Sequence, residues 1–196
     1  MNFMKKTAVV VALASTLTLS GCGYNTLRVK DEAVTAAWSE VQNQYQRRAD
    51  LVPNLVNVVK GYAKHEEQVL TEVTQARANV AGLKVDKEVL EDPALFQKYQ
   101  EAQAQMTGAL SRLIAVSENY PDLKANEQFR DLQVQLEGTE NRIAVARNRY
   151  ITTVQDFNSY ARQFPQVMTA KVIGMDTKPN FSAEQSAQKA PTVSFN

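Results

Sequence analysis

Residues 34–83 read VTAAWSEVQNQYQRRADLVPNLVNVVKGYAKHEEQVLTEVTQARANVAGL. Apolar side chains recur here at alternating spacings of four and three residues, which predicts a helix packed lengthwise against other helices. The stripe stays in phase through Pro53 and Gly61, so we expect one long helix from about residue 31 to about residue 81, with Gly82 as its C-terminal cap. Because proline removes a backbone hydrogen bond, this helix should bend, or restart coaxially, at Pro53. The stripe consists of Val34, Trp38, Val41, Tyr45, Arg48, Val52, Leu55, Val59, Tyr62, Glu66, Val69, Val73, Ala76, Val80 and Leu83.

Two further stripes of the same period follow the first. Pro93 suits a first helical position and opens the second stripe, which ends at Tyr120-Pro121, and Pro165 stops the third. Leu83 to Asp92 and Pro121 to Asn126 are expected to be connections. The chain is therefore predicted to be all-α, an elongated antiparallel bundle of three long helices over residues 31–165, with the first bent near Pro53. The second stripe is Leu95, Tyr99, Ala102, Met106, Ala109, Leu113, Val116 and Tyr120, and the third is Phe129, Leu132, Leu136, Thr139, Ile143, Ala146, Tyr150, Thr153, Phe157, Tyr160 and Phe164.

The last segment, 166–196, contains Gly174, Pro179 and Pro191 among Ser, Ala and Gln residues. This composition predicts an irregular tail that packs on the bundle, with a short helix near 183–189. The residues expected to hold it there are Val172, Phe181, Val193 and Phe195.

The first 21 residues differ from the rest of the chain. Lys5 and Lys6 precede an uncharged apolar run, Thr7 to Leu19, that is too short to span a bilayer and indicates a cleaved export signal. Leu19-Ser20-Gly21-Cys22 resembles the bacterial lipobox, which implies cleavage before Cys22 and attachment of diacylglycerol and palmitate-type acyl chains to it. Residues 22–30 would then be a lipidated anchor and short tether that faces the periplasm. Since Gly and not Asp follows the Cys, the resemblance favours the outer membrane over the inner one.

Composition excludes several classes of function. The 196 residues contain 22 Lys and Arg against 21 Asp and Glu, and the predicted mature chain has a formal charge of −1, so nucleic-acid binding is not expected. One Cys and one His exclude an internal disulfide and argue against a zinc site. We expect no metal and no cofactor.

Several charged and amide side chains are candidates for structural or partner-binding roles. Arg48 and Glu66 stand in the predicted helical seam, where each needs a partner. We hypothesise that Arg48 or Arg47 pairs with Glu140 or another acidic group of the third helix. His65-Glu66 does not make a zinc-protease motif, because Val69 stands where the second His is required. The full candidate set is Arg47, Arg48, Asp50, Asn54, His65, Glu66, Glu140, Asn141 and Arg147.

Several long motifs in order resemble the LemA family. They are Ala37-Trp38-Ser39, RRADLVPNLV at 47–56, KGYAKHE at 60–66, YPDLKAN at 120–126 and TENRI at 139–143, and the likeness extends from Tyr24 to the PTVSF tail at 191–195. One departure is Ile151, where many relatives have Asn. The resemblance implies a membrane-anchored bacterial envelope protein with an elongated helical bundle and without catalytic activity or cofactor. It also suggests partners of the TPM-domain or membrane-protease type.

Three functions remain open at this point. The first is a non-catalytic lipoprotein that acts as a scaffold or adaptor for an envelope partner, and the second is a homo-oligomeric spacer of the cell envelope. The third is an enzyme, which would need a polar pocket built from side chains such as Asp50, Asn54, Glu140 and Arg147.

Overall fold

The computed structural model describes residues 2–63, 65–83 and 87–181, with residues 2–22 described through their backbone alone. Within these residues the chain is helical and contains no strand, so the predicted all-α class is confirmed. The elements are α1 (Asn2–Tyr62), α2 (Glu67–Ala81), the short 3-10 helix η1 (Lys87–Leu90), α3 (Pro93–Ser117), α4 (Pro121–Ala125), α5 (Glu127–Arg162) and α6 (Gln166–Val172).

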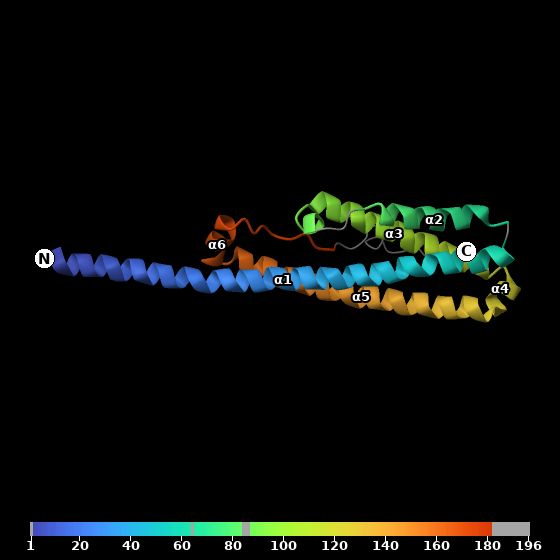
Figure 1. The fold of residues 1–196 in the computed structure, drawn as a ribbon, viewed down its shortest axis with the longest axis horizontal. Helices are drawn as coiled ribbons and strands as arrows, with labels where there is room; N and C mark the ends of the chain where they lie inside the picture. The colour runs from blue at the N-terminus through green and yellow to red at the C-terminus, as the bar shows by residue number, and fades with distance from the viewer. Residues whose placement is uncertain (1, 64, 84–86, 182–196) are drawn as a thin grey trace, which may run out of the picture.

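The helices form an elongated bundle built from two antiparallel pairs (Figure 1). α1 and α5 lie side by side over most of the length of α5, and α2 and α3 form a second pair that packs against α1. The N-terminal part of α1 projects beyond the bundle, at the end where α6 lies. α4 turns the chain at the opposite end.

The prediction of one continuous helix from 31 to 81 is wrong, and with it the count of three long helices. The chain reverses direction after Tyr62, and α2 returns antiparallel to α1. The reversal has a physical cause, since a straight continuation would carry Leu70, Val73 and Ala76 past the end of α5 and into water. Folding back buries all three. The spacing of the apolar residues does not reveal the turn. α1 and α2 each need an apolar face, so the same spacing fits a helix that continues and one that folds back.

α1 passes through Pro53 without interruption. A proline inside a helix leaves the carbonyl four residues earlier without its backbone donor, and here that carbonyl belongs to Ala49. Arg77 of α2 supplies a donor, with its Nε 3.1 Å from the Ala49 oxygen. The returning helix therefore compensates the defect in α1 and is itself tied to it.

The other helix ends follow local sequence signals. Asp92 caps α3 by accepting hydrogen bonds from the backbone N–H groups of Ala94 and Leu95, at 2.8 and 3.3 Å. Asn126 caps α5 through the N–H of Phe129, at 2.9 Å, and Gly82 caps α2 as predicted. Two connections contain more structure than expected, since 121–125 forms α4 and the 83–92 connection buries two apolar side chains, Val89 and Leu90.

The buried side chains divide into two cores along the bundle axis. The core near α6, here called the aromatic core, contains Leu27, Val34, Ala37, Trp38, Val41, Tyr45, Val89, Leu90, Phe96, Tyr99, Ile143, Ala146, Tyr150, Val154, Phe157, Ala161 and Ala170. The core near α4, here called the aliphatic core, contains Val52, Leu55, Val59, Ala63, Leu70, Val73, Ala76, Met106, Ala109, Leu110, Leu113, Leu123, Phe129, Leu132 and Leu136.

The predicted stripes agree with these cores except near helix ends. Leu95 is exposed and Phe96 is buried in its place. In α5 the buried face shifts from Thr153 to Val154, as expected for a 3.6-residue helix drifting against a 3.5-residue repeat. Phe164 is exposed because α5 ends at Arg162, two residues before it.

The segments at the two ends of the bundle are more regular than predicted. Residues 22–30, expected to be a tether, continue α1, and Leu27 within them is fully buried. The tail begins with α6 and then lies back along the bundle, where Asn158 exchanges two hydrogen bonds with the Lys178 backbone. Phe181 packs on the aromatic core as predicted, whereas Val172 is exposed and the prediction for it is wrong. The predicted helix at 183–189, Val193 and Phe195 lie outside the described residues.

Candidate functional site

Arg48 lies at the boundary between the two cores, and 1% of its surface is exposed. Its Nη1 donates to Glu140 Oε1 of α5 at 3.0 Å and to Thr107 Oγ1 of α3 at 2.7 Å. Its Nη2 donates to the Gln103 side-chain and backbone oxygens, at 2.5 and 3.2 Å. Of the pairings hypothesised for Arg47 and Arg48, the structure contains the one between Arg48 and Glu140. The Arg48 guanidinium joins three helices.

The environment of Arg48 offsets part of the cost of burying its charge. Glu140 supplies a carboxylate that is partly open to water, and the Tyr45 ring lies 5.1 Å from the guanidinium carbon, within cation–π range. Burial raises the pKa of the Tyr45 hydroxyl, while Arg147 and Arg48 oppose that rise. Burial likewise raises the pKa of Tyr99, next to Gln103. The charge in this part of the core is therefore confined to the arginine and its carboxylate.

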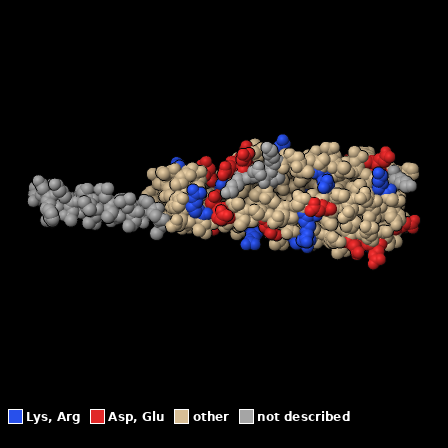
Figure 2. All heavy atoms as spheres, viewed as in Figure 1, with Lys and Arg blue, Asp and Glu red and all other residues tan. Residues whose placement is uncertain are grey.

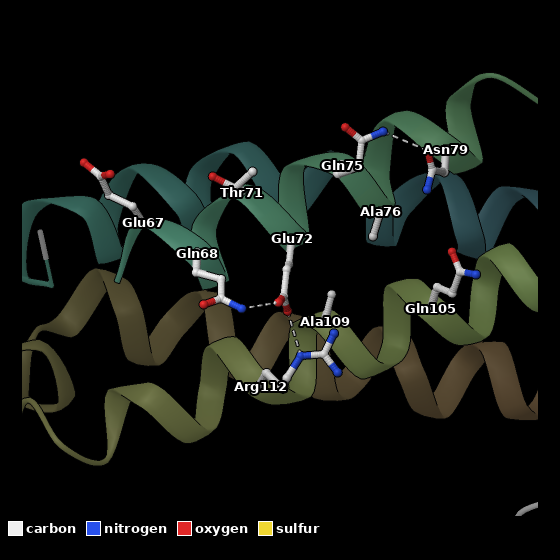
Figure 3. A pocket seen from close by; sticks show the side chains of 10 residues that line it. All are labelled: Glu67, Gln68, Thr71, Glu72, Gln75, Ala76, Asn79, Gln105, Ala109 and Arg112. Atoms are coloured by element: carbon white, nitrogen blue, oxygen red, sulfur yellow. Dashed lines mark hydrogen bonds and ion pairs between the residues drawn. The ribbon is translucent and has the colours of Figure 1, made fainter. Parts of the chain in front are cut away.

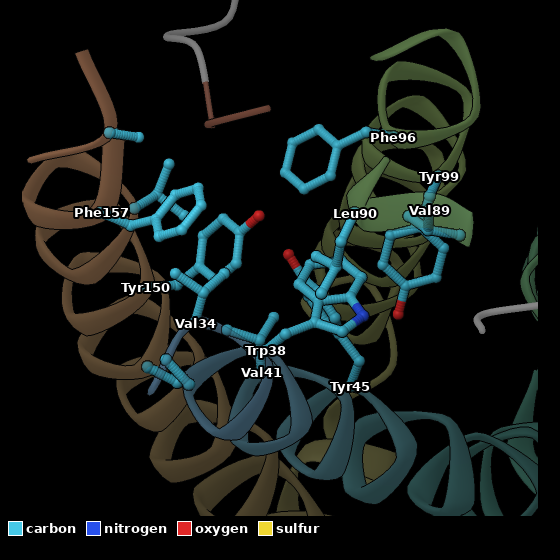
Figure 4. Packing of buried hydrophobic residues seen from close by; sticks show 14 of the residues in the cluster. Val34, Trp38, Val41, Tyr45, Val89, Leu90, Phe96, Tyr99, Tyr150 and Phe157 are labelled. Atoms are coloured by element: carbon cyan, nitrogen blue, oxygen red, sulfur yellow. The ribbon is translucent and has the colours of Figure 1, made fainter. Parts of the chain in front are cut away.

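The aromatic core surrounds Trp38, the single tryptophan of the chain (Figure 4). Its ring centroid lies 5.4 to 5.5 Å from those of Phe96, Tyr99 and Tyr150. Phe181 from the tail closes the cluster, 5.0 Å from Phe96 and 5.4 Å from Tyr150. These groups fill the space between α1, α3 and α5, so the cluster is a packed core and not a ligand pocket.

Arg147 contributes to the same end of the bundle from outside the core. Its guanidinium carbon lies 4.4 Å from the Phe181 ring centroid, a cation–π distance. Tyr150 donates to the Pro179 carbonyl at 2.9 Å, so together with Asn158 three side chains of α5 hold the tail. Lys178 pairs with Asp31 of α1 at 3.2 Å, and this links the tail to a second helix.

The remaining candidate residues do not converge on one site. Arg47, Asp50, Asn54, His65 and Asn141 are exposed. Of the residues required for the enzyme alternative, only Glu140 lines any of the three cavities described for this fold. The four side chains proposed for that alternative therefore do not form a shared pocket.

Glu66 lies in the chain reversal between α1 and α2 and not in a helical seam. Tyr120 donates to its Oε1 at 3.0 Å, which ties the reversal to the start of α4. The hydrogen bond to Glu66 raises the pKa of the Tyr120 hydroxyl, because the proton is held against the carboxylate. Asn126 donates to the Tyr62 hydroxyl at 2.9 Å and strengthens the same end.

A groove of about 690 Å³ lies between α2 and α3, on the side of this pair away from α1 and α5 (Figure 3). Its floor includes the small side chains of Ala76 and Ala109, and its walls are mainly amides, hydroxyls and carboxylates. One ion pair crosses it, with Arg112 Nε 2.9 Å from Glu72 Oε2. The groove is lined by Glu67, Gln68, Thr71, Glu72, Gln75, Ala76, Asn79, Gln105, Ala109 and Arg112.

The surface carries charges of both signs. On the face shown in Figure 2 the acidic and basic side chains are interspersed, and neither sign dominates a continuous area. Among the residues that the structure describes, no three His, Cys, Asp or Glu side chains gather as a metal site would require. In the same part of the chain, no helix has the length and apolarity needed to cross a membrane.

The elongated bundle and the order of its motifs agree with the resemblance noted in the sequence. The sequence model of the LemA family matches residues 37–195. The chain belongs to the LemA family. Among its LemA-family relatives, Magnetosome protein MamQ 2 of Paramagnetospirillum magneticum is 25% identical over 94% of this chain and 72% of its own length. Protein LemA of Metamycoplasma hominis is 25% identical over 69% of this chain and 58% of its own length. Magnetosome protein MamQ of Magnetospirillum gryphiswaldense is 22% identical over 94% of this chain and 73% of its own length.

Sequence reasoning did not predict the groove between α2 and α3. The groove exists only because α2 folds back, and the sequence was interpreted as one continuous helix there. A signal was nevertheless present, since Thr71, Gln75 and Asn79 lie four residues apart and place polar groups along one face of α2.

Proposed function

We propose that this LemA-family chain is a lipid-anchored, non-catalytic bundle of the bacterial envelope that holds a partner protein in the groove between α2 and α3. The main observation in support of this proposal is the groove. It extends along two helices, and its alanine floor lets a bound segment approach the helix backbones closely. Its amide walls offer donors and acceptors to a polar partner without any catalytic arrangement.

The anchor part of the proposal rests on the lipobox-like sequence ending at Cys22. Two or more acyl chains hold a protein stably on a membrane, whereas one chain gives only marginal binding. The groove lies toward the α4 end of the bundle, away from the end that carries Cys22. This separation would leave the groove open to a protein in the periplasm while the chain stays on the membrane, with the outer membrane favoured.

The absence of catalysis in this proposal follows from how the polar groups are used. Glu72 and Arg112 neutralise each other across the groove, and the buried Arg48 is occupied in joining three helices. The resemblance to the family supplies candidate partners of the TPM-domain or membrane-protease type. A second copy of the chain is the competing occupant, which would make the protein a spacer.

The test is photo-crosslinking in cells from the groove wall. A benzophenone amino acid at Gln75, which is exposed in the groove, is expected to capture one defined envelope protein. The same amino acid at Gln155, exposed on α5, is the matched control and should capture none of it. Capture of a second copy from Gln75 would instead support the spacer, and identical products from both positions would contradict the groove.

A substitution that fills the groove provides a second measurement. Q105W should abolish the Gln75 crosslink, because an indole at this wall occupies the space that the partner would take. Q155W is the control with the same change of residue on α5. Both variants should keep the wild-type melting temperature, since both glutamines are exposed.

A further inference from the structure

Three large apolar side chains, here called the row, lie exposed within nine residues of sequence at the α5–α6 corner. Phe164 is 84% exposed, Met168 61% and Val172 86%. Met168 and Val172 are spaced four residues apart and share the outer face of α6, and Phe164 lies just before this helix. The opposite face of α6 is fixed to the bundle through Ala170, which is buried, and Ile173 packs on the aromatic core beside it. The helix that carries Met168 and Val172 is thus held against the bundle.

The helix α6, which carries two members of the row, lies next to the start of the predicted mature chain. A Cβ placed on Gly23, the residue after Cys22, would lie 3.6 Å from Gln166 Cγ and 3.8 Å from Thr169 Oγ1. Figure 1 shows α6 against α1 where α1 leaves the bundle on its N-terminal side. An acylated Cys22 would therefore bring α6 to the membrane surface.

The charges around the row suit a phospholipid surface. From 157 to 175 the chain contains no Asp or Glu, while Arg162 and Lys171 are exposed beside the row. A cationic rim around apolar side chains is the pattern of segments that lie in the headgroup region of anionic bilayers. Tyr24, also partly exposed, adds an aromatic group close to Cys22.

We propose that α6 is a second membrane contact, in which Phe164, Met168 and Val172 enter the headgroup region of the bilayer that holds Cys22. This inference rests on the lipid anchor of the proposed function. An acyl anchor alone leaves the bundle free to tilt, whereas a second contact on α6 sets its direction. The bundle then stands with its α4 end, and the groove, away from the membrane.

The test uses the chain from Cys22 onward, coupled through its single Cys to a maleimide phospholipid in vesicles of phosphatidylcholine and phosphatidylglycerol. F164W places a tryptophan in the row, and V134W places one on α5 at a site that is 67% exposed near the other end. The emission of the added tryptophan is obtained by subtracting that of the wild type, in which Trp38 is buried. Lipids with brominated acyl chains should quench the F164W emission about twofold and leave V134W unchanged.

Adding M168E and V172E to F164W should remove the quenching, because two carboxylates oppose insertion into an anionic surface. These positions are exposed, so the melting temperature should stay at the wild-type value. Equal emission of F164W in brominated and ordinary lipids would overturn the proposal. A shift of F164W emission that depends on protein concentration and not on brominated lipid would also overturn it, and would point to a second copy on α6.

Incorporation of an alkyne fatty acid at Cys22 in cells, with C22S as control, tests the anchor separately. Incorporation together with unquenched F164W would leave the anchor standing and reject the α6 contact. A lack of incorporation would reject lipidation of Cys22. The vesicle measurement depends on chemical coupling, so it would still decide whether the row enters a bilayer.

Discussion

The two cores of this bundle differ in side-chain composition. The aromatic core, near α6, gathers Trp38, three tyrosines and two phenylalanines among aliphatic side chains and is closed by the tail through Phe181. The aliphatic core, near α4, is filled mainly by Val, Leu and Ala and carries the groove between α2 and α3. Arg48 lies between them. One half is fixed by interlocking rings and polar contacts, while the other carries the groove in which we propose that a partner binds.

Reversing the charge of Arg48, which lies between the two cores, should lower the free energy of unfolding more than any other substitution proposed here. R48E removes the donors to Gln103 and Thr107 and places a buried carboxylate beside Glu140. We expect the free energy of unfolding to fall by about 4 kcal/mol, as measured by urea denaturation, with a lower melting temperature. R47E is the control and should change stability by less than about 0.5 kcal/mol, since Arg47 is exposed. An unchanged melt for R48E would show that the two cores do not depend on this junction.

Removing the ring that closes the aromatic core should have the next largest effect. F181A deletes the contacts with Phe96 and Tyr150 and the cation–π contact with Arg147, so we expect a loss of about 2 kcal/mol. Hydrogen exchange should rise around Trp38 and stay unchanged in α2. V172A, at an exposed position of the same tail, should leave both measurements at wild type. A uniform rise in exchange would mean that the two cores unfold as one unit.

Alkaline pH should also weaken the aromatic core, which contains three tyrosines whose pKa is raised by burial. Burial raises the folded-state pKa of Tyr150 above its ordinary value of 10.0, as it does for Tyr45 and Tyr99. The folded state therefore retains the proton more strongly, and stability is full below pH 10 and falls as pH rises beyond it. The loss can reach about 1.4 kcal/mol per pH unit for each such tyrosine. Y150F should have a shallower decline in the free energy of unfolding above about pH 10, and a slope equal to the wild type would contradict this account.

The sequence predicted the parts of this structure that depend on local spacing. The apolar positions from Val34 to Val59 and the Arg48–Glu140 pair are as expected, because both follow from one helix face meeting another. The reversal after Tyr62 was missed, because an in-phase stripe is compatible with a helix that continues and with one that folds back. The groove and the exposed row on α6 were missed for a related reason, since each depends on where a neighbouring helix ends.

The smallest predicted effect concerns a hydrogen bond at the boundary between the two cores. Arg77 of α2 donates to the Ala49 carbonyl that Pro53 leaves free, so α2 is tied to α1 one residue beyond Arg48. R77A should cost about 1 kcal/mol in the wild-type background, because a half-buried carbonyl loses its donor. In P53A the N–H of residue 53 returns to that carbonyl, and R77A should then cost less. A double-mutant cycle from urea denaturation measures the difference. Full additivity would show that Arg77 acts through packing alone and that the proline does not help to position the returning helix.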